Sequence, residues 1–198
     1  HSDEVIIVDG SNYVDSMSAI QVSAYLDAPI LLNGKAGLDK GTRAEMIRLR
    51  AEHAYLVGCN INPKLEADLV EEGCKVTRIS AEKPFDLSYK CGEFANKNKT
   101  TTKKSLILAS SEVFADSLSM SSYSYANKVP MLLVPKDIDD NMAKIINDYG
   151  AEEVLVIGGE NTISSESMAK IGKARRISGQ DRYQTSRIIQ KDYYPDSK

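Results

Sequence analysis

Short apolar runs alternate with helical patterns along the chain, and the whole alternation occurs twice. Apolar runs between polar residues predict buried strands at 5–8, 29–32 and 54–57, and again at 106–109, 130–133 and 154–157. Short strands are predicted to follow at 75–79 and 174–177. Helical spacing and cap residues predict helices at 12–26, 39–50, 112–127 and 139–149, with others starting near 62, 84, 164 and 180. This alternation predicts an α/β protein of two tandem Rossmann-like (flavodoxin-like) units, each with a mostly parallel three-layer sheet.

The two halves also share residues. Segments 14–32 and 115–133 are identical at seven of nineteen aligned positions: Asp15/Asp116, Ser16/Ser117, Ser18/Ser119, Ser23/Ser124, Pro29/Pro130, Leu31/Leu132 and Leu32/Leu133. Further along, 54–60 aligns with 154–160 and 75–80 with 174–179. We therefore predict a first repeat at 3–95, a polar cationic linker at 96–104 and a second repeat at 105–194.

Composition excludes several classes of function. The net charge of −3 and a pI of about 5.5 argue against a nucleic-acid partner, which needs a basic face. No apolar run approaches 18 residues, so no membrane span is predicted. Cys59, Cys74 and Cys91 form no C-x-x-C pair and only two histidines are present, so no metal site is expected. Buried thiols are favoured, and one disulfide plus a free thiol is the alternative.

The residues after the strands offer little for catalysis or cofactor binding. The first strands end in "VDGSN" and "ASSEV", without a G-x-G-x-x-G or P-loop fingerprint, so no cofactor is predicted. Asp15-Ser16 and Asp116-Ser117 would need a general base to act as a hydrolase, and His53 has no counterpart in the second copy. Compensation of the helix dipole explains these aspartates better. We expect no enzyme.

Two features suggest binding. The glycine turns after the third strands, at Gly58, Gly158 and Gly159, either turn the chain or cradle a phosphate. The segment "ARRISGQDRYQTS" (174–186) gathers arginines that can hold anionic oxygens and a tyrosine that can stack on a sugar: Arg175, Arg176, Arg182 and Tyr183. A local interpretation is equally open, in which Gly179 turns the chain, Asp181 caps the last helix and Arg182 pairs with a carboxylate.

Three stretches together, "RISGQDRYQTS", "ADSLSMSSYSYANKVPMLLV" and "VLVIGGENTIS", resemble the Gram-positive cell wall-binding repeat 2 family in order and spacing. The resemblance covers nearly the whole chain, twice. It implies a non-catalytic module that anchors a secreted surface protein noncovalently to the wall through an anionic secondary polymer, a polysaccharide or a teichoic-acid-like chain.

Carried over by position, the resemblance marks three groups of residues. The strand motif is Pro29, Ile30, Leu31 and Leu32, and again Pro130, Met131, Leu132 and Leu133. The glycine turns are Gly58, Gly158, Gly159 and Gly179. The polymer-binding candidates are Arg175, Arg176, Arg182, Tyr183, Asp181 and Arg78, of which the resemblance marks Asp181, Arg182 and Tyr183. The first copy departs from the pattern at Ala81, Pro84-Phe85 and Cys59, so we expect it to have lost a contact or to be structural.

The family usually has three repeats, and two are visible here. The segment "GQDRYQTSRIIQKDY" therefore either completes the second unit or begins a third, and self-association is a further alternative. Two other functions compete with wall anchoring: a self-assembling surface-layer module and, more remotely, a sugar- or nucleotide-modifying enzyme on a Rossmann-like scaffold. Linked weak contacts would gain avidity in an anchor without any tight site.

Overall fold

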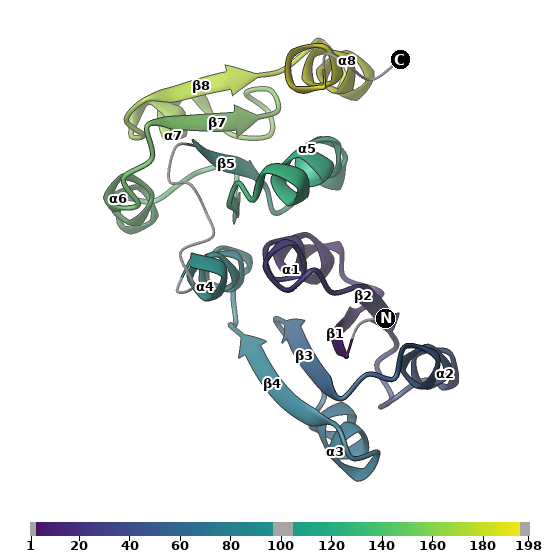
Figure 1. Ribbon diagram of the computed structural model, residues 1–198. Helices are drawn as coiled ribbons and strands as arrows, with labels where there is room; N and C mark the ends of the chain where they lie inside the picture. Colours follow the sequence, from purple (N-terminus) through teal and green to yellow (C-terminus); the bar gives the residue numbers. More distant parts are fainter. Residues whose placement is uncertain (1–2, 97–104, 195–198) are drawn as a thin grey trace. The chain divides into compact units, whose positions relative to one another are not determined.

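The computed structural model describes residues 3–96 and 105–194. The chain divides into two compact units, residues 1–98 and 99–198, and each is considered by itself (Figure 1). The linker expected at 96–104 lies outside the described residues except for Asn96, which ends the last helix of the first unit.

The first unit is a four-stranded parallel sheet with four helices. Its strands have the order β2-β1-β3-β4. The elements along the chain are β1 (Glu4–Asp9), α1 (Tyr13–Leu26), β2 (Ile30–Asn33), α2 (Lys40–Leu49), β3 (His53–Gly58), α3 (Pro63–Glu71), β4 (Lys75–Ser80) and α4 (Pro84–Asn96).

The second unit repeats this topology, with the strand order β6-β5-β7-β8. Its elements are β5 (Ser105–Ser110), α5 (Phe114–Asn127), β6 (Met131–Val134), α6 (Asp140–Asp148), β7 (Glu153–Ile157), α7 (Ser165–Ala169), β8 (Ala174–Ile177) and α8 (Arg182–Tyr193). The predicted fold class, two tandem α/β units with parallel sheets, is confirmed. Helix α8 packs against α5, so the segment after 179 completes the second unit.

Both faces of the first sheet are covered, which explains the unbroken apolar strands. Alternate residues of β1 point to opposite faces. Ile6 and Val8 enter one core cluster together with residues of α1 and α4, and Val5 and Ile7 enter another with residues of α2 and α3. Figure 1 shows the corresponding helices on the two sides of this sheet. The unit is therefore a three-layer sandwich.

Two pairs of residues shared by the copies, Ser23/Ser124 and Pro29/Pro130, make the same hydrogen bonds in each unit. Ser23 Oγ donates to the Ala28 carbonyl and Ser124 Oγ to the Val129 carbonyl, both at 2.7 Å. Each bond ties the end of a helix to the start of the next strand. The carbonyls of Pro29 and Pro130 then accept from the first strands, from Ile6 N and Ile107 N, both at 2.9 Å. The residues shared by segments 14–32 and 115–133 therefore specify this connection from helix to strand.

The third and fourth residues of the strand motif lie differently in the two units. Leu132 and Leu133 are fully buried in β6, whereas Leu32 in β2 is 62% exposed. All three cysteines are free thiols, and Cys91 is buried. Among the described residues, no helix has the length and apolar character needed to cross a bilayer.

The glycine turn after β7 provides a test of this architecture. Gly158 has a φ of +103°, and a Cβ there would lie 2.7 Å from Asp116 Oδ2. We expect G158A to lower the free energy of unfolding by about 1–3 kcal/mol, because both the backbone and the carboxylate oppose a side chain. Gly159 is the matched control, since a Cβ there meets nothing within 4 Å.

Urea denaturation followed by circular dichroism measures both variants. G159A should stay within about 0.5 kcal/mol of the wild type. Equal losses of stability in G158A and G159A would contradict the conclusion that the turn requires glycine at position 158 in particular.

Candidate functional site

The predicted arginine cluster lies where β8 leads into α8, and two of its arginines are used within the fold. Arg175 donates from Nε to Glu153 Oε1 and from Nη2 to the Tyr193 hydroxyl, both at 2.7 Å. Arg176 donates to the carbonyls of Gly158 and Ile163, at 2.8 and 2.9 Å. Arg176 therefore stabilises the glycine turn.

The corresponding arginine of the first unit has a different partner. Arg78 in β4 donates from Nε and Nη2 to Glu66 Oε2 in α3, at 2.9 and 2.7 Å. Both groups are partly exposed, so this pair contributes little to stability. The ion pair with Glu66 nevertheless engages the guanidinium of Arg78, which sequence analysis placed among the candidate polymer contacts.

Some residues of the G-x-D-R-Y-x-T motif stabilise the start of α8, and others are exposed to solvent. Asp181 caps the helix by accepting from Gln184 N at 2.8 Å, and Gly179 N donates to Thr185 Oγ1 at 3.0 Å. A Cβ at Gly179 would lie 2.7 Å from Thr185 N, so no larger residue fits. The role of Thr185 was missed by sequence analysis, although the residue stands in the quoted motif.

Arg182 and Tyr183 are the motif residues left facing solvent. Tyr183 is 75% exposed. Within residues 3–96 and 105–194, neither side chain has a hydrogen-bond or ring partner, and Arg182 has no ion pair. The expected local pairing of Arg182 with a carboxylate is thus absent from the described residues. Its charge still acts on Asp116: burial raises the pKa of that carboxyl, and Arg182 opposes the rise.

The first unit lacks this exposed pair. Pro84 begins α4 at the position of Arg182, and Phe85 takes the position of Tyr183. Phe85 is only 3% exposed and stacks on Tyr89 with ring centroids 6.5 Å apart. Residues that face solvent in the second unit are therefore replaced by packing residues in the first.

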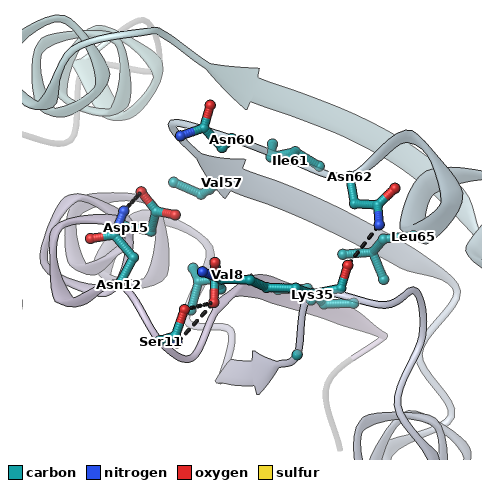
Figure 2. Close-up of a pocket in the computed structure, with 13 residues that line it drawn as sticks. Val8, Ser11, Asn12, Asp15, Lys35, Val57, Asn60, Ile61, Asn62 and Leu65 are labelled. Atoms are coloured by element: carbon teal, nitrogen blue, oxygen red, sulfur yellow. Dashed lines mark hydrogen bonds between the residues drawn. The ribbon is translucent and has the colours of Figure 1, made fainter.

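A crevice at the carboxyl ends of β1, β2 and β3 was not predicted from the sequence. Its volume is about 360 Å³, and Figure 2 shows its lining. The loops after β1 and β3 lead to helices on opposite faces of the sheet, and such a switch point is where open α/β sheets bind ligands. The signal in the sequence was the strand order alone, since the lining comes from three separate loops.

Two carboxylates shape this crevice. Asp9 Oδ1 accepts from Ser11 N and Ser11 Oγ, at 2.8 and 2.7 Å. Burial opposes ionisation of Asp9, but these bonds and the charge of Lys35 outweigh it and lower its pKa. Asp15 Oδ1 accepts from Cys59 N at 3.0 Å and from Asn12 Nδ2 at 3.1 Å. Burial dominates there and raises the pKa of Asp15.

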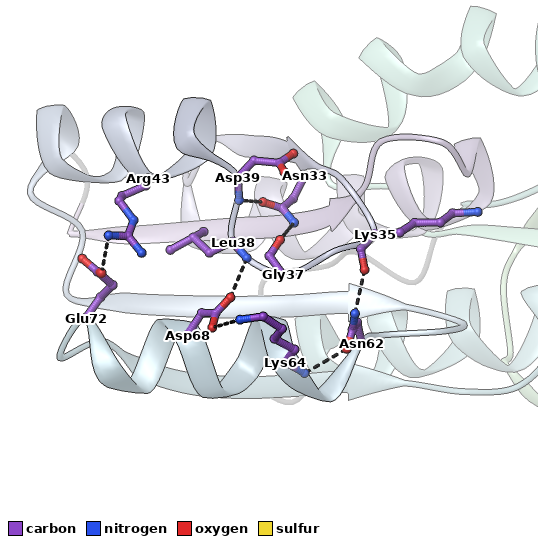
Figure 3. Close-up of polar contacts among 10 residues, drawn as sticks. All are labelled: Asn33, Lys35, Gly37, Leu38, Asp39, Arg43, Asn62, Lys64, Asp68 and Glu72. Carbon is purple, nitrogen blue, oxygen red and sulfur yellow. Dashed lines mark hydrogen bonds and ion pairs between the residues drawn. The ribbon is translucent and has the colours of Figure 1, made fainter.

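The loop that carries Lys35 is held by a polar network (Figure 3). Asn33, buried at the end of β2, donates to the carbonyls of Gly34 and Gly37, both at 2.7 Å, and accepts from Asp39 N at 3.0 Å. From α3, Asp68 Oδ2 accepts from Leu38 N at 2.9 Å. The position of this loop is therefore set before any ligand binds.

The thiol of Cys59, which follows the glycine turn of the first unit, is poorly suited to nucleophilic chemistry. Burial raises the pKa of the Cys59 thiol to about 11, so it stays protonated and weakly nucleophilic at neutral pH. In the part of the chain that the structure describes, no group of three or more His, Cys, Asp or Glu side chains could hold a metal ion.

Together, the fold and the site define a class: a tandem-repeat α/β protein with polar contacts at its strand ends. Residues 78–168 match the model of a specific family, cell wall binding domain 2 (CWB2). The predicted resemblance is confirmed, and this region of the chain belongs to that family. The match begins in β4 and ends in α7, so the family repeat is offset from the compact unit.

Individual relatives agree with the family match. The chain is 26% identical over 190 residues to the N-acetylmuramoyl-L-alanine amidase LytC of Bacillus subtilis (strain 168), covering 94% of this chain and 37% of that protein. Cwp6 from Clostridium difficile superposes with a TM-score of 0.88 at 26% identity, over 98% of this chain and 32% of that one. Cwp8 from the same organism gives 0.83 at 24% identity, over 98% and 34%, and shows the fold alone.

The chain thus spans about a third of the length of these proteins. The shared region supports a cell wall binding module associated with the wall or surface of Gram-positive bacteria. The amidase activity named for the Bacillus protein belongs to a chain of which this one covers 37%, and it is not carried over.

The buried Asp116 predicts a dependence of stability on pH. Burial raises its folded-state pKa above the unfolded value of about 3.9, so ionisation above that pH weakens the fold. We expect D116N to be more stable than the wild type at pH 7, and the difference to vanish as the pH falls to about 4.

Urea denaturation at pH 7, 5.5 and 4 measures this difference, with D192N on the exposed face of α8 as the control. A D116N protein that is less stable at pH 7 would mean that the negative charge itself holds the glycine turn.

Proposed function

We propose that the chain is a non-catalytic anchoring module. It binds an anionic secondary polymer of the cell wall noncovalently and so attaches a secreted surface protein to a Gram-positive envelope. The observation that carries the proposal is the exposure of Arg182 and Tyr183 on a motif whose other polar residues serve the fold. The family match supplies the wall as the target.

The chemistry of this pair suits such a polymer. A guanidinium binds phosphate or carboxylate oxygens through two parallel hydrogen bonds, and a tyrosine ring offers an apolar face to a sugar. Arg175, Arg176 and Asp181 support the fold around this pair, and Arg78 supports the first unit, because each is held by a partner within its own unit. The strand motif and glycine turns have the same supporting role.

A single exposed pair makes a weak site, which agrees with anchoring by repetition. Linked weak sites gain affinity through effective concentration, and salt weakens each charged contact. A module of this kind holds a wall reversibly and needs no deep pocket.

A self-assembling surface-layer module is the second candidate, and one observation favours it. Phe114 and Leu118, four residues apart on α5, are 53% and 52% exposed. An exposed apolar stripe on a helix is typical of a protein interface. Concentration-dependent elution from a sizing column without binding to purified walls would favour this function. The remaining alternative, an enzyme, is weaker, because Asp15 is committed to loop contacts and Asp9 Oδ1 already accepts two bonds.

The anchoring proposal is tested by co-sedimentation with Gram-positive walls before and after acid removal of their anionic polymers. We expect binding to be lost on stripping, and R182A to weaken binding to intact walls about tenfold or more, because a charge-assisted hydrogen bond contributes about 1.5–3 kcal/mol. R187A removes the same charge from the next turn of α8 and is the matched control.

Two results would contradict the proposal. Equal losses in R182A and R187A would indicate a diffuse charge effect, and unchanged binding after stripping would exclude the anionic polymer as the target.

A further inference from the structure

We infer that the crevice of the first unit binds one neutral, hexose-sized sugar residue, at a site separate from Arg182 and Tyr183. The inference deepens the proposed function and rests on it in one respect, since the sugar would belong to a wall glycan. It is argued from the lining of the crevice at the ends of β1, β2 and β3.

The shape and polarity of the crevice fit a sugar ring. Its volume of about 360 Å³ lies at the lower end of small-molecule sites, which span about 300–1,000 Å³. Val57, Ile61 and Leu65 supply an apolar wall for the C–H face of a ring (Figure 2). The side chains of Ser11 and Lys35 lie across from this wall, and Asn60 lies at its edge beside Ile61. A sugar has this same division between an apolar face and a hydroxyl edge.

Three polar groups in the crevice remain available to hydroxyls. Asp9 Oδ2 accepts no hydrogen bond within the described residues, because both bonds from Ser11 go to Oδ1. The Asn60 amide and the Lys35 ammonium likewise have no hydrogen-bond partner in residues 3–96 and 105–194. A carboxylate accepts from a hydroxyl, an ammonium donates to one, and an amide does both.

The charges of the crevice favour a neutral ligand over a phosphate. Asp9 and Asp15 both face it, against one lysine, Lys35. The helix N-termini that usually hold phosphate are already capped: Val14 N donates to Asn12 Oδ1 at 3.2 Å and Lys64 N to Asn62 Oδ1 at 2.9 Å. An anion would meet carboxylates without gaining backbone donors.

The site is also built in advance. Asn62 Nδ2 donates to the Lys35 carbonyl at 2.6 Å, and the buried Asn33 fixes the rest of the loop (Figure 3). Binding therefore requires little ordering, which raises the affinity that a few hydrogen bonds can give.

The second unit lacks these residues, although its topology is the same. At the aligned positions Ser110 replaces Asp9, Val113 replaces Asn12, Val134 replaces Asn33 and Glu160 replaces Asn60, whereas Lys136 keeps the charge of Lys35. The sugar site is thus specific to the first unit, and Lys136 offers a matched control.

The test is a titration of the ¹⁵N-labelled full chain, followed by amide chemical shifts, with glucose, N-acetylglucosamine, N-acetylmannosamine and inorganic phosphate as separate probes. We expect saturable shifts with at least one sugar, confined to the loops after β1, β2 and β3, and none there with phosphate. K35M and N60A should each weaken binding about fivefold or more, and K136M should leave it unchanged. D9S, which introduces the residue of the second unit, should abolish the shifts.

Several results would overturn the inference. These are no saturable shift with any sugar, shifts that map to the second unit, tighter binding of phosphate than of sugar, or equal effects of K35M and K136M. The exposed Asn60 keeps the test valid if D9S fails to fold. Co-sedimentation of the wild-type chain with walls, compared with the sugar titration, separates the two proposals. If the chain binds walls but shows no sugar-induced shifts, the crevice site alone is rejected. If it shows sugar-induced shifts but does not bind walls, the anchor alone is rejected.

Discussion

In each unit a buried aspartate in the first turn of the first helix lies against the glycine turn that follows the third strand. Asp15 accepts from Cys59 N at 3.0 Å, and its Oδ2 would lie 2.8 Å from a Cβ at Gly58. Asp116 stands in the same relation to Gly158. This contact joins the β1–α1 connection to the β3–α3 connection, so it sets the strand-end geometry on which both candidate sites depend. Its cost is a desolvated carboxylate, visible in the raised pKa of both aspartates.

The same turn gives one arginine of the motif a structural role. Arg176 in β8 donates to the carbonyls of Gly158 and Ile163, so it supports the same turn that Asp116 contacts. A guanidinium suits this task because its fork of donors can satisfy two carbonyls at once. One arginine of the motif thus orders the strand ends, and the next, Arg182, stays exposed.

The fold was predictable from the sequence because its signals are local. Apolar runs marked the strands, and caps such as Asn62 and Asp181 marked helix starts within two residues of the observed ones. The sequence named Arg182 and Tyr183, but it could not separate them from the arginines that serve the fold, because the partners of those arginines are distant in the sequence. Nothing near Arg175 indicates that Glu153 and Tyr193 will occupy it, and nothing near Lys35 indicates that Asn62 will hold its loop.

The offset between the family repeat and the compact unit follows from packing. The repeat at 78–168 opens with β4 and α4, yet these elements complete the first sheet. Gln21 Nε2 of α1 donates to the Ser88 carbonyl of α4 at 2.9 Å in a buried contact, and Leu87 and Cys91 fill the core beside α1. A chain cut at the start of the sequence repeat would therefore lose the edge strand β4 and one of the two helices, α1 and α4, that cover one face of the first sheet. The matched stretch therefore joins the last strand and helix of the first unit to the first three strands of the second.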